Sequence, residues 1–230
     1  MSKINIYKYA LYQYMEKDTI SKTLKILQNH FSQERKTTLN RMRGEDPYKI
    51  LVGCIVSINI KDEVTEKILE ELFEKADSFE ELLKLEQEEL ERMLYLARYR
   101  KIKANTLKNI SKEILDKYNG KVPDTKEELL KIKGIGPKTA NVVLNFAFNK
   151  PYIPIDSNTL RITNRIGWIT TEKHADVEIM LIKNLDETTL KNANALFMLH
   201  GKTICVPVSP FCSRCPVNEL CAKVGVEKSR

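Results

Sequence analysis

Apolar residues recur along most of the chain every three to four positions, which is the spacing of one face of an α-helix. In residues 20–31, for example, Ile20, Leu24, Leu27 and Phe31 fall on one stripe. No segment sustains the two-residue alternation that is typical of a half-buried strand. The pattern therefore predicts an all-α chain.

Start and stop signals divide this pattern into separate helices. Asp46 can cap a helix that begins at Pro47 and is apolar on nearly all sides, so we expect a buried central helix with Cys54 as a small core residue. Asp124, with Glu127 three residues later, has the spacing of a capping box and starts another helix. The expected helices are residues 20–31, 48–58, 62–75, 79–84, 87–94, 101–118, 124–133, 137–148, 157–166, 175–184 and 187–199.

Length and composition indicate a globular protein of one large or two small domains. The 230 residues are 42% hydrophobic and 30% charged. The longest apolar run, residues 50–60, contains Gly53, Ser57 and Asn59 and is too short to span a membrane. The first sixteen residues carry charges and four tyrosines rather than the apolar core of a signal peptide. We therefore expect a cytoplasmic monomer without a membrane partner, in which disulfides are rare.

Charge is distributed unevenly along the chain. The net charge is +7, but residues 62–91 hold thirteen acidic residues and three lysines, so the rest of the chain carries +17. Residues 98–112 contain six basic residues and no acidic one. This asymmetry is typical of a protein with one face that binds a polyanion, although a charge run can also be only a solvated helix face.

The stretch with the clearest local chemistry is residues 129–140, Leu-Leu-Lys-Ile-Lys-Gly-Ile-Gly-Pro-Lys-Thr-Ala. A helix ends at Gly134, Gly136 allows a second turn, and Pro137 starts a new helix whose free amides suit a phosphate. Lys138 lies in the first turn of that helix, where the helix dipole disfavours a charged ammonium. A neutral amine is a nucleophile. The alternative is an ordinary helix–turn–helix corner with an exposed lysine.

Four cysteines lie close together near the C-terminus, with the spacing Cys-x6-Cys-x2-Cys-x5-Cys. In a reducing compartment such a group is typical of metal ligands rather than of disulfides. Zinc commonly uses two Cys-x2-Cys pairs, whereas this spacing has one pair and two wider arms, which favours an iron–sulfur cluster over zinc without excluding zinc. The four candidate ligands are Cys205, Cys212, Cys215 and Cys221.

The glycine turn, Lys138, Asp156 and the cysteines, in this order, resemble the endonuclease III family of DNA base-excision glycosylases, which belongs to the helix-hairpin-helix superfamily. The resemblance runs from about residue 20 to residue 221 and is most specific in residues 133–145 and 155–168. It implies two α-helical domains with DNA in the cleft between them. Residues 41–150 would form a six-helix barrel with the hairpin, and residues 1–40 and 151–230 a domain that holds a [4Fe–4S] cluster.

The resemblance also implies a reaction and its residues. Lys138 is the nucleophile and Asp156 the essential carboxylate of a bifunctional DNA glycosylase and abasic-site lyase, which acts through a Schiff base and β-elimination on oxidised or damaged pyrimidines. For Asp156 a plain helix N-cap is the simpler interpretation, and both roles can hold. The expected partner is double-stranded DNA with damaged bases or abasic sites, at the nucleoid in a prokaryote. Superfamily members often hold a monovalent cation at the hairpin.

Further residues are expected to contact DNA. Asn59 stands where the family has a glutamine that fills the hole left by the flipped base, and Tyr99 is the candidate for an apolar wedge. Asn158 stands where relatives often have histidine, so base preference is open. The expected contacts are Lys133, Gly134, Gly136, Thr139, Asn59, Tyr99, Arg100, Lys101, Lys202 and Arg214.

Two other functions are compatible with the same residues. One is a mismatch-type thymine or uracil glycosylase, or an adenine glycosylase, although such enzymes often lack a lysine at the position of Lys138. The other is a DNA-binding iron–sulfur protein without catalysis, for which the hairpin and the cysteines suffice.

Overall fold

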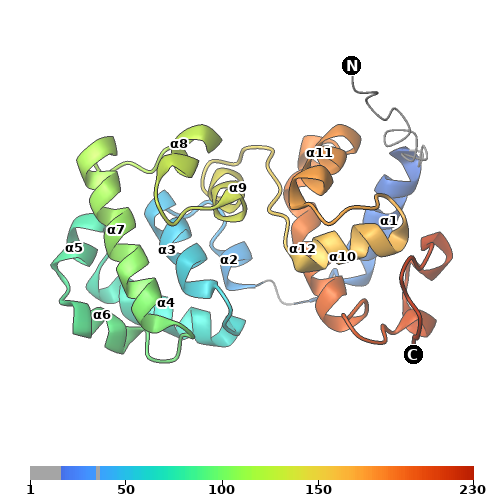
Figure 1. Ribbon diagram of the computed structural model, residues 1–230, viewed down its shortest axis with the longest axis horizontal. Coiled ribbons are helices and arrows are strands. Elements are labelled where there is room, and N and C mark those ends of the chain that lie inside the picture. The colour runs from blue at the N-terminus through green and yellow to red at the C-terminus, as the bar shows by residue number, and fades with distance from the viewer. Residues whose placement is uncertain (1–16, 35–36) are drawn as a thin grey trace, which may run out of the picture. The chain divides into compact units, whose positions relative to one another are not determined.

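The computed structural model describes residues 17–34 and 37–230. All regular structure in these residues is helical, so the predicted all-α class is confirmed for the described chain. The described residues divide into two compact units, residues 37–154 and residues 17–34 with 155–230 (Figure 1). None of their helices has the length and apolar composition needed to cross a bilayer. The first sixteen residues, for which no signal-peptide core is expected, lie outside the described range.

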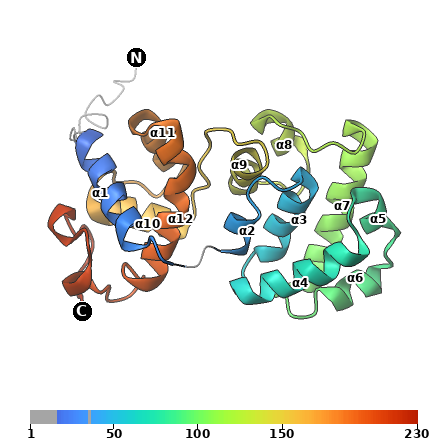
Figure 2. The same cartoon turned by 180° about the vertical axis from the view of Figure 1, so that it is seen from behind.

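Helix α3 (Pro47–Ser57) is the core of the unit 37–154. Its start is set as the sequence predicts: Pro47 is the first helical residue, and Asp46 Oδ1 accepts a hydrogen bond from the Tyr48 amide at 2.8 Å. Cys54 is buried within it. The helices that pack on α3 are α2 (Thr38–Arg41), α4 (Asp62–Lys75), α7 (Arg100–Tyr118) and α9 (Pro137–Phe146) (Figures 1 and 2).

The remaining helices of this unit are short. Helices α5 (Phe79–Lys84) and α6 (Gln87–Met93) pack on α7, and α8 (Lys126–Lys131) packs on α9. The prediction that Asp124 caps α8 is wrong by one residue, because Thr125 Oγ1 accepts from the Glu128 amide. Asp124 instead forms an ion pair with Lys150 at 2.8 Å, a contact between residues far apart in the sequence.

The other unit joins the first described segment to the C-terminal part of the chain. Helix α1 (Lys17–His30) packs on α12 (Glu187–Thr203), which also packs on α10 (Ser157–Ile166). Helix α11 (His174–Asn184) packs on α10. Two single turns of 3₁₀-helix, Cys212–Arg214 and Asn218–Leu220, follow in the cysteine segment. Helix α12 extends beyond its predicted end at residue 199, so the last turn before the cysteines is helical.

Candidate functional site

The two glycines in the turn between α8 and α9 have different structural roles. Gly134 has φ of +103°, and a Cβ there would lie 3.0 Å from Thr106 Cγ2, so both backbone and space require glycine. Gly136 is the extended N-cap of α9, and a Cβ there would meet nothing within 4 Å. Ile135 between them is buried and fixes the turn to the core. The backbone at Gly136 therefore faces open space.

Free amides follow this turn. Within the described residues, the amides of Gly134, Gly136 and Lys138 donate no hydrogen bond. Together with the positive dipole end of α9 they form a group of donors that suits a phosphate. The Lys133 amide does not belong to this group, because it donates to Glu113 Oε2 at 3.1 Å.

Lys138 is exposed in the first turn of α9. Helix α9 packs on α3, and the charge of Lys138 is near enough to act on the Cys54 thiol. Burial raises the pKa of that thiol to about 12, and Lys138 partly opposes the rise. Cys54 is therefore an unreactive core residue, as predicted, whereas the Lys138 side chain is exposed.

Asp156 is half-buried and caps α10, which confirms the predicted structural role. Its Oδ1 accepts from the Thr159 amide at 2.8 Å and from Thr159 Oγ1 at 3.0 Å. Its Oδ2 accepts from Asn158 Nδ2 over 3.4 Å, which is longer than a usual N–H···O bond. The cap thus fixes one oxygen and leaves the other with acceptor capacity.

A chain of hydrogen bonds connects Asp156 with the cysteine segment. Arg161 Nη2 donates to Asn158 Oδ1 at 2.9 Å and to the Gly201 carbonyl at 3.0 Å. Arg161 Nε donates to the Cys205 carbonyl at 3.1 Å. The contacts of Arg161 could not be predicted from the sequence, because Gly201 and Cys205 lie 40 and 44 residues further along the chain.

The four cysteines line one hollow, whose lining includes His200 and Arg165. All of them are free thiols. Burial raises the pKa of the Cys215 thiol to about 11, and the other three cysteines add to the rise, so the four sulfurs act on one another. No three His, Cys, Asp or Glu side chains in the described residues converge closely enough to hold a single metal ion.

Two polar side chains also reach these sulfurs. Arg165 Nη1 lies 3.5 Å from Cys205 Sγ, and His200 Nε2 lies 3.8 Å from Cys215 Sγ. Burial lowers the pKa of His200 to about 4, so the ring is neutral near pH 7.

Two expected DNA contacts lie near the cysteine segment. The Arg214 guanidinium lies over the Phe211 ring at 4.0 Å and donates to the Thr203 carbonyl, whereas the Lys202 side chain is exposed.

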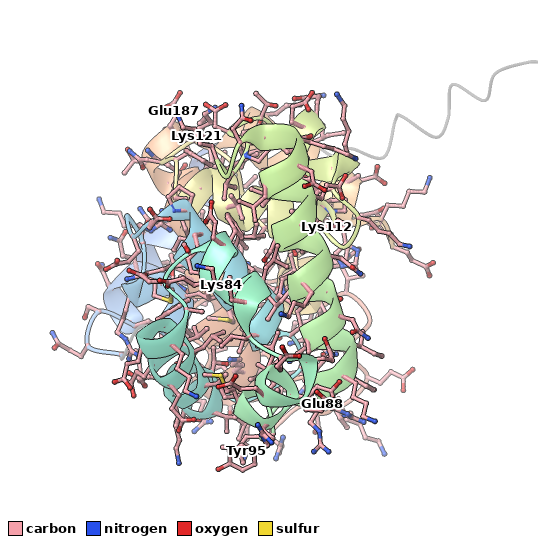
Figure 3. The ribbon with its side chains drawn as sticks, turned by 90° about the vertical axis from the view of Figure 1, so that its left-hand side faces the viewer. Lys84, Glu88, Tyr95, Lys112, Lys121 and Glu187 are labelled. Atoms are coloured by element: carbon pink, nitrogen blue, oxygen red, sulfur yellow. The ribbon has the colours of Figure 1, made fainter. Side chains whose placement is uncertain are left out.

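The basic run at residues 98–112 does not lie wholly on one exposed face, which corrects the interpretation of the entire run as a polyanion-binding surface; only its exposed members remain candidates for phosphate contacts. Lys103 is 4% exposed, and Lys108 is partly buried; both donate to backbone carbonyls at helix ends. Lys112 lies on the outer surface of α7, while Tyr95 and Lys121 lie near its two ends (Figure 3). This division cannot be predicted from the sequence, because a count of charges does not distinguish buried from exposed lysines.

The expected intercalating residues are exposed and belong to two loops of the unit 37–154. Asn59 follows α3 with φ of +57°, and Tyr99 precedes α7 with φ of +61°. Exposed apolar side chains accompany them in these loops and at the start of α7: Ile58, Tyr95, Leu96 and Ile102. Arg100 and Lys101, in the first turn of α7, are also exposed.

Comparison with known proteins decides the family. The family model described as "HhH-GPD superfamily base excision DNA repair protein" matches residues 52–187, which include Lys138 and Asp156. Endonuclease III of Thermotoga maritima is 37% identical over 176 residues, 76% of this chain and 83% of that protein. The chain belongs to the endonuclease III family of the HhH-GPD superfamily. Endonuclease III of Rickettsia felis is 30% identical over 83% of this chain and 90% of that protein.

Solved structures agree with this membership. A trapped covalent intermediate of endonuclease III with DNA has a TM-score of 0.81 and 28% identity, covering 91% of this chain and 97% of that one. A thermostable thymine-DNA glycosylase has the same TM-score at 23% identity, which shows the shared fold alone. The expected enzyme class, a DNA glycosylase and abasic-site lyase of base excision repair, is thus confirmed at the level of the endonuclease III family.

Proposed function

We propose that this endonuclease III family member is a bifunctional glycosylase and abasic-site lyase in which Lys138 is the nucleophile. One observation carries the proposal: an exposed lysine stands in the first turn of α9, directly after a glycine turn with three unused amides. Those amides would hold a DNA phosphate, which would place the sugar of the same strand near the amine.

The reaction then follows from amine chemistry. Unprotonated Lys138 Nζ attacks C1′ of the sugar; the bond from C1′ to the base breaks, and the base leaves with the electron pair and takes up a proton. Ring opening gives an imine between Nζ and C1′. The imine draws electrons from C2′, so a base can remove a C2′ proton and the 3′ phosphate leaves. Water then hydrolyses the imine and frees Lys138.

Asp156 would stabilise the positive charge that develops on the sugar as the base leaves. The geometry supports this role because the Thr159 cap fixes Oδ1 and Oδ2 keeps acceptor capacity. Asn158 and Arg161 would hold the carboxylate in its orientation. Lys138 belongs to the unit 37–154 and Asp156 to the unit that includes residues 155–230, so each unit would supply one residue of the proposed reaction.

The cysteines would hold a [4Fe–4S] cluster, whose role when bound is to cross-link their segment. Four thiolates on one zinc ion lie within about 4 Å of one another, and the described residues contain no such group. A [4Fe–4S] cluster would take its ligands from the four cysteines that line this hollow, which are the usual donors for such a cluster. The Arg165 and His200 contacts would support the sulfurs.

Duplex DNA would be held from several elements. The target nucleotide must leave the base stack to reach the amine, so Asn59 and Tyr99 would fill or widen the space it leaves. Arg100, Lys101, Lys202 and the partly buried Thr139 would contact phosphates, and carbonyls of the hairpin would hold a monovalent cation. Binding that rests on such contacts weakens steeply as salt increases.

Oxidised pyrimidines are the proposed substrates, and a panel of lesion duplexes tests them. The panel contains duplexes with oxidised thymine, with oxidised cytosine, with a uracil or thymine mismatch, and with adenine opposite oxidised guanine. Each duplex is assayed with and without borohydride. We expect strand cleavage and a trapped adduct with the oxidised pyrimidines. Cleavage restricted to mismatches would instead support the mismatch-type glycosylase, and DNA binding without cleavage would support a binding protein.

A further inference from the structure

Two loops of the unit 37–154 hold an exposed residue in a left-handed backbone conformation. Asn59 in the loop after α3 has φ of +57°, and Tyr99 before α7 has φ of +61°. Asparagine adopts this conformation more readily than other residues with side chains, whereas for an aromatic residue it is unusual and persists where surrounding contacts determine it. The contacts that connect the two loops show what holds them in place.

Lys103 bonds to both loops. Its backbone amide donates to the Tyr99 carbonyl at 3.0 Å. Its Nζ donates to the Val56 carbonyl at 2.7 Å and to the carbonyl of Ile58, the residue directly before Asn59, at 2.6 Å. The residue is 4% exposed, so its amine is withdrawn from solvent and from phosphate.

We propose that Lys103 is a positioning residue for base excision, which holds Asn59 and Tyr99 at a fixed separation so that both enter the duplex as the target nucleotide leaves it. The inference rests on the proposed function. Lys103 contacts neither the DNA nor the reacting atoms; it acts through the two loops.

The hydrogen bonds from Lys103 Nζ to the two carbonyls can persist in both protonation states of the amine. The two carbonyls lie at the C-terminal end of α3, where the helix dipole favours a cation. An ammonium has three donors and a neutral amine has two, so the two carbonyls are satisfied in either protonation state. Without the amine, the carbonyls at Val56 and Ile58 lose their donor, and the loop can relax to a more common conformation at Asn59.

Helix α7 offers a matched control. Lys108 makes the same kind of contact, because its Nζ donates to the carbonyls of Leu83 and Leu85 at the end of α5. That segment carries no residue proposed to contact DNA. Lys108→Met therefore removes equivalent hydrogen bonds from the same helix and leaves the contacts of the two loops unchanged.

The experiment compares Lys103→Met and Lys108→Met in the full-length protein with its metal content intact. One assay measures single-turnover release of oxidised thymine from a duplex, and the other measures borohydride trapping on a single-stranded abasic oligonucleotide, in which no stacked partner strand must be entered. We expect Lys103→Met to slow base release on the order of tenfold to a hundredfold. Trapping on the single strand should stay within about twofold of the wild type, since the amine chemistry does not need the loops. Lys108→Met should match the wild type in both assays.

A double-mutant test separates positioning from general stability. In a chain with Asn59→Gly and Tyr99→Ala, Lys103→Met should slow base release no further, because the side chains through which it acts are gone. If Lys103→Met does not fold, Lys103→Gln, which keeps a shorter donor, is held to the same criteria. Equal losses in Lys103→Met and Lys108→Met, or wild-type base release in Lys103→Met, would overturn the inference.

Failure of the proposed function would look different. If the wild-type protein gives no trapped adduct on the single strand, the Schiff-base chemistry is absent. If the wild type is trapped and Lys103→Met loses trapping and base release in the same proportion, Lys103 does not act through the loops, and the chemistry stands.

Discussion

Gly201 and Asn158 are in such close contact that a Cβ on Gly201 would lie 2.6 Å from Asn158 Oδ1 and 2.7 Å from its Cβ. Helix α12 therefore has no side chain at the point where α10 places Asn158. The contact matters because Asn158 donates to Asp156 Oδ2 and accepts from Arg161. Glycine at position 201 makes room for the group that orients the candidate carboxylate.

Gly201→Ala should accordingly impair excision more than DNA binding. The added methyl group must displace Asn158 and would cost about 1–3 kcal/mol of stability, as overpacking usually does. We expect base release to slow on the order of tenfold, as misplaced catalytic groups cause, with duplex affinity nearly unchanged. The measurement pairs single-turnover excision with a binding titration. Asn192→Ala, on the exposed side of α12, is the control, and equal rates for both variants would contradict the prediction.

The two glycines of the hairpin should respond differently to alanine. Gly134→Ala meets both a φ of +103° and Thr106 at 3.0 Å, so the free energy of unfolding should fall by about 1–3 kcal/mol. Gly136→Ala has room for its Cβ, so stability should change little, while the methyl group obstructs the approach of a DNA backbone. Urea unfolding and duplex titration separate the two effects. Unchanged DNA affinity in Gly136→Ala would remove the hairpin from the interface.

Prediction from the sequence succeeded where local chemistry decides structure. Helices α4, α5 and α10 have the predicted limits, because apolar spacing within each helix, and for α5 and α10 a capping side chain directly before it, marks them locally. Helix α2 was not predicted, since four residues give no periodicity. The cap of α8 was misplaced because a distant partner, Lys150, binds Asp124. Long-range contacts leave no local signal.

The candidate site shows the same limit. Lys138 and the four cysteines stand in motifs that can be recognised locally, and the cap by Asp156 follows from its position before α10. The roles of Lys103 and Arg161 depend on carbonyls more than 40 residues away, which no pattern in the sequence connects.

Stability should depend on pH through Lys103. Burial lowers the pKa of its amine from 10.5 to about 8, and no acidic side chain among the described residues forms an ion pair with it. Between pH 8 and 10.5 the unfolded chain therefore binds a proton that the folded chain does not, so the free energy of unfolding rises with pH, by at most about 1.4 kcal/mol per pH unit. Below pH 8 this contribution is flat.

The test is urea unfolding of the wild type and Lys103→Met at several pH values from 7 to 10.5, with the difference between the two proteins as the readout. Taking this difference removes the contribution of the other titrating groups, which both proteins share. We expect it to shift in favour of the wild type as pH rises through the window. A difference that stays constant or shifts toward the variant would show that folding does not lower the pKa of the amine.

The cysteines should separate into two classes. Cys205→Ala removes a proposed cluster ligand, so iron and acid-labile sulfide should fall well below the about four irons per chain of a [4Fe–4S] protein. Cys54→Ala should keep the full iron content and lose about 1–2 kcal/mol of stability, because it only leaves a small cavity in the core. Metal analysis of both purified variants checks the prediction. Zinc in place of iron in the wild-type protein would contradict the cluster assignment.

The central claim is that Lys138 Nζ bonds to the sugar of the damaged nucleotide. The direct test is borohydride trapping on a duplex with an oxidised pyrimidine, followed by proteolysis and mass mapping of the lysine that carries the sugar remnant. Lys131→Ala, in the same hairpin and paired with Glu128, is the control. The account predicts an adduct on Lys138 in the wild type and in Lys131→Ala, and none in Lys138→Ala; an adduct on another residue, or none in a wild-type protein that releases the base, would contradict it.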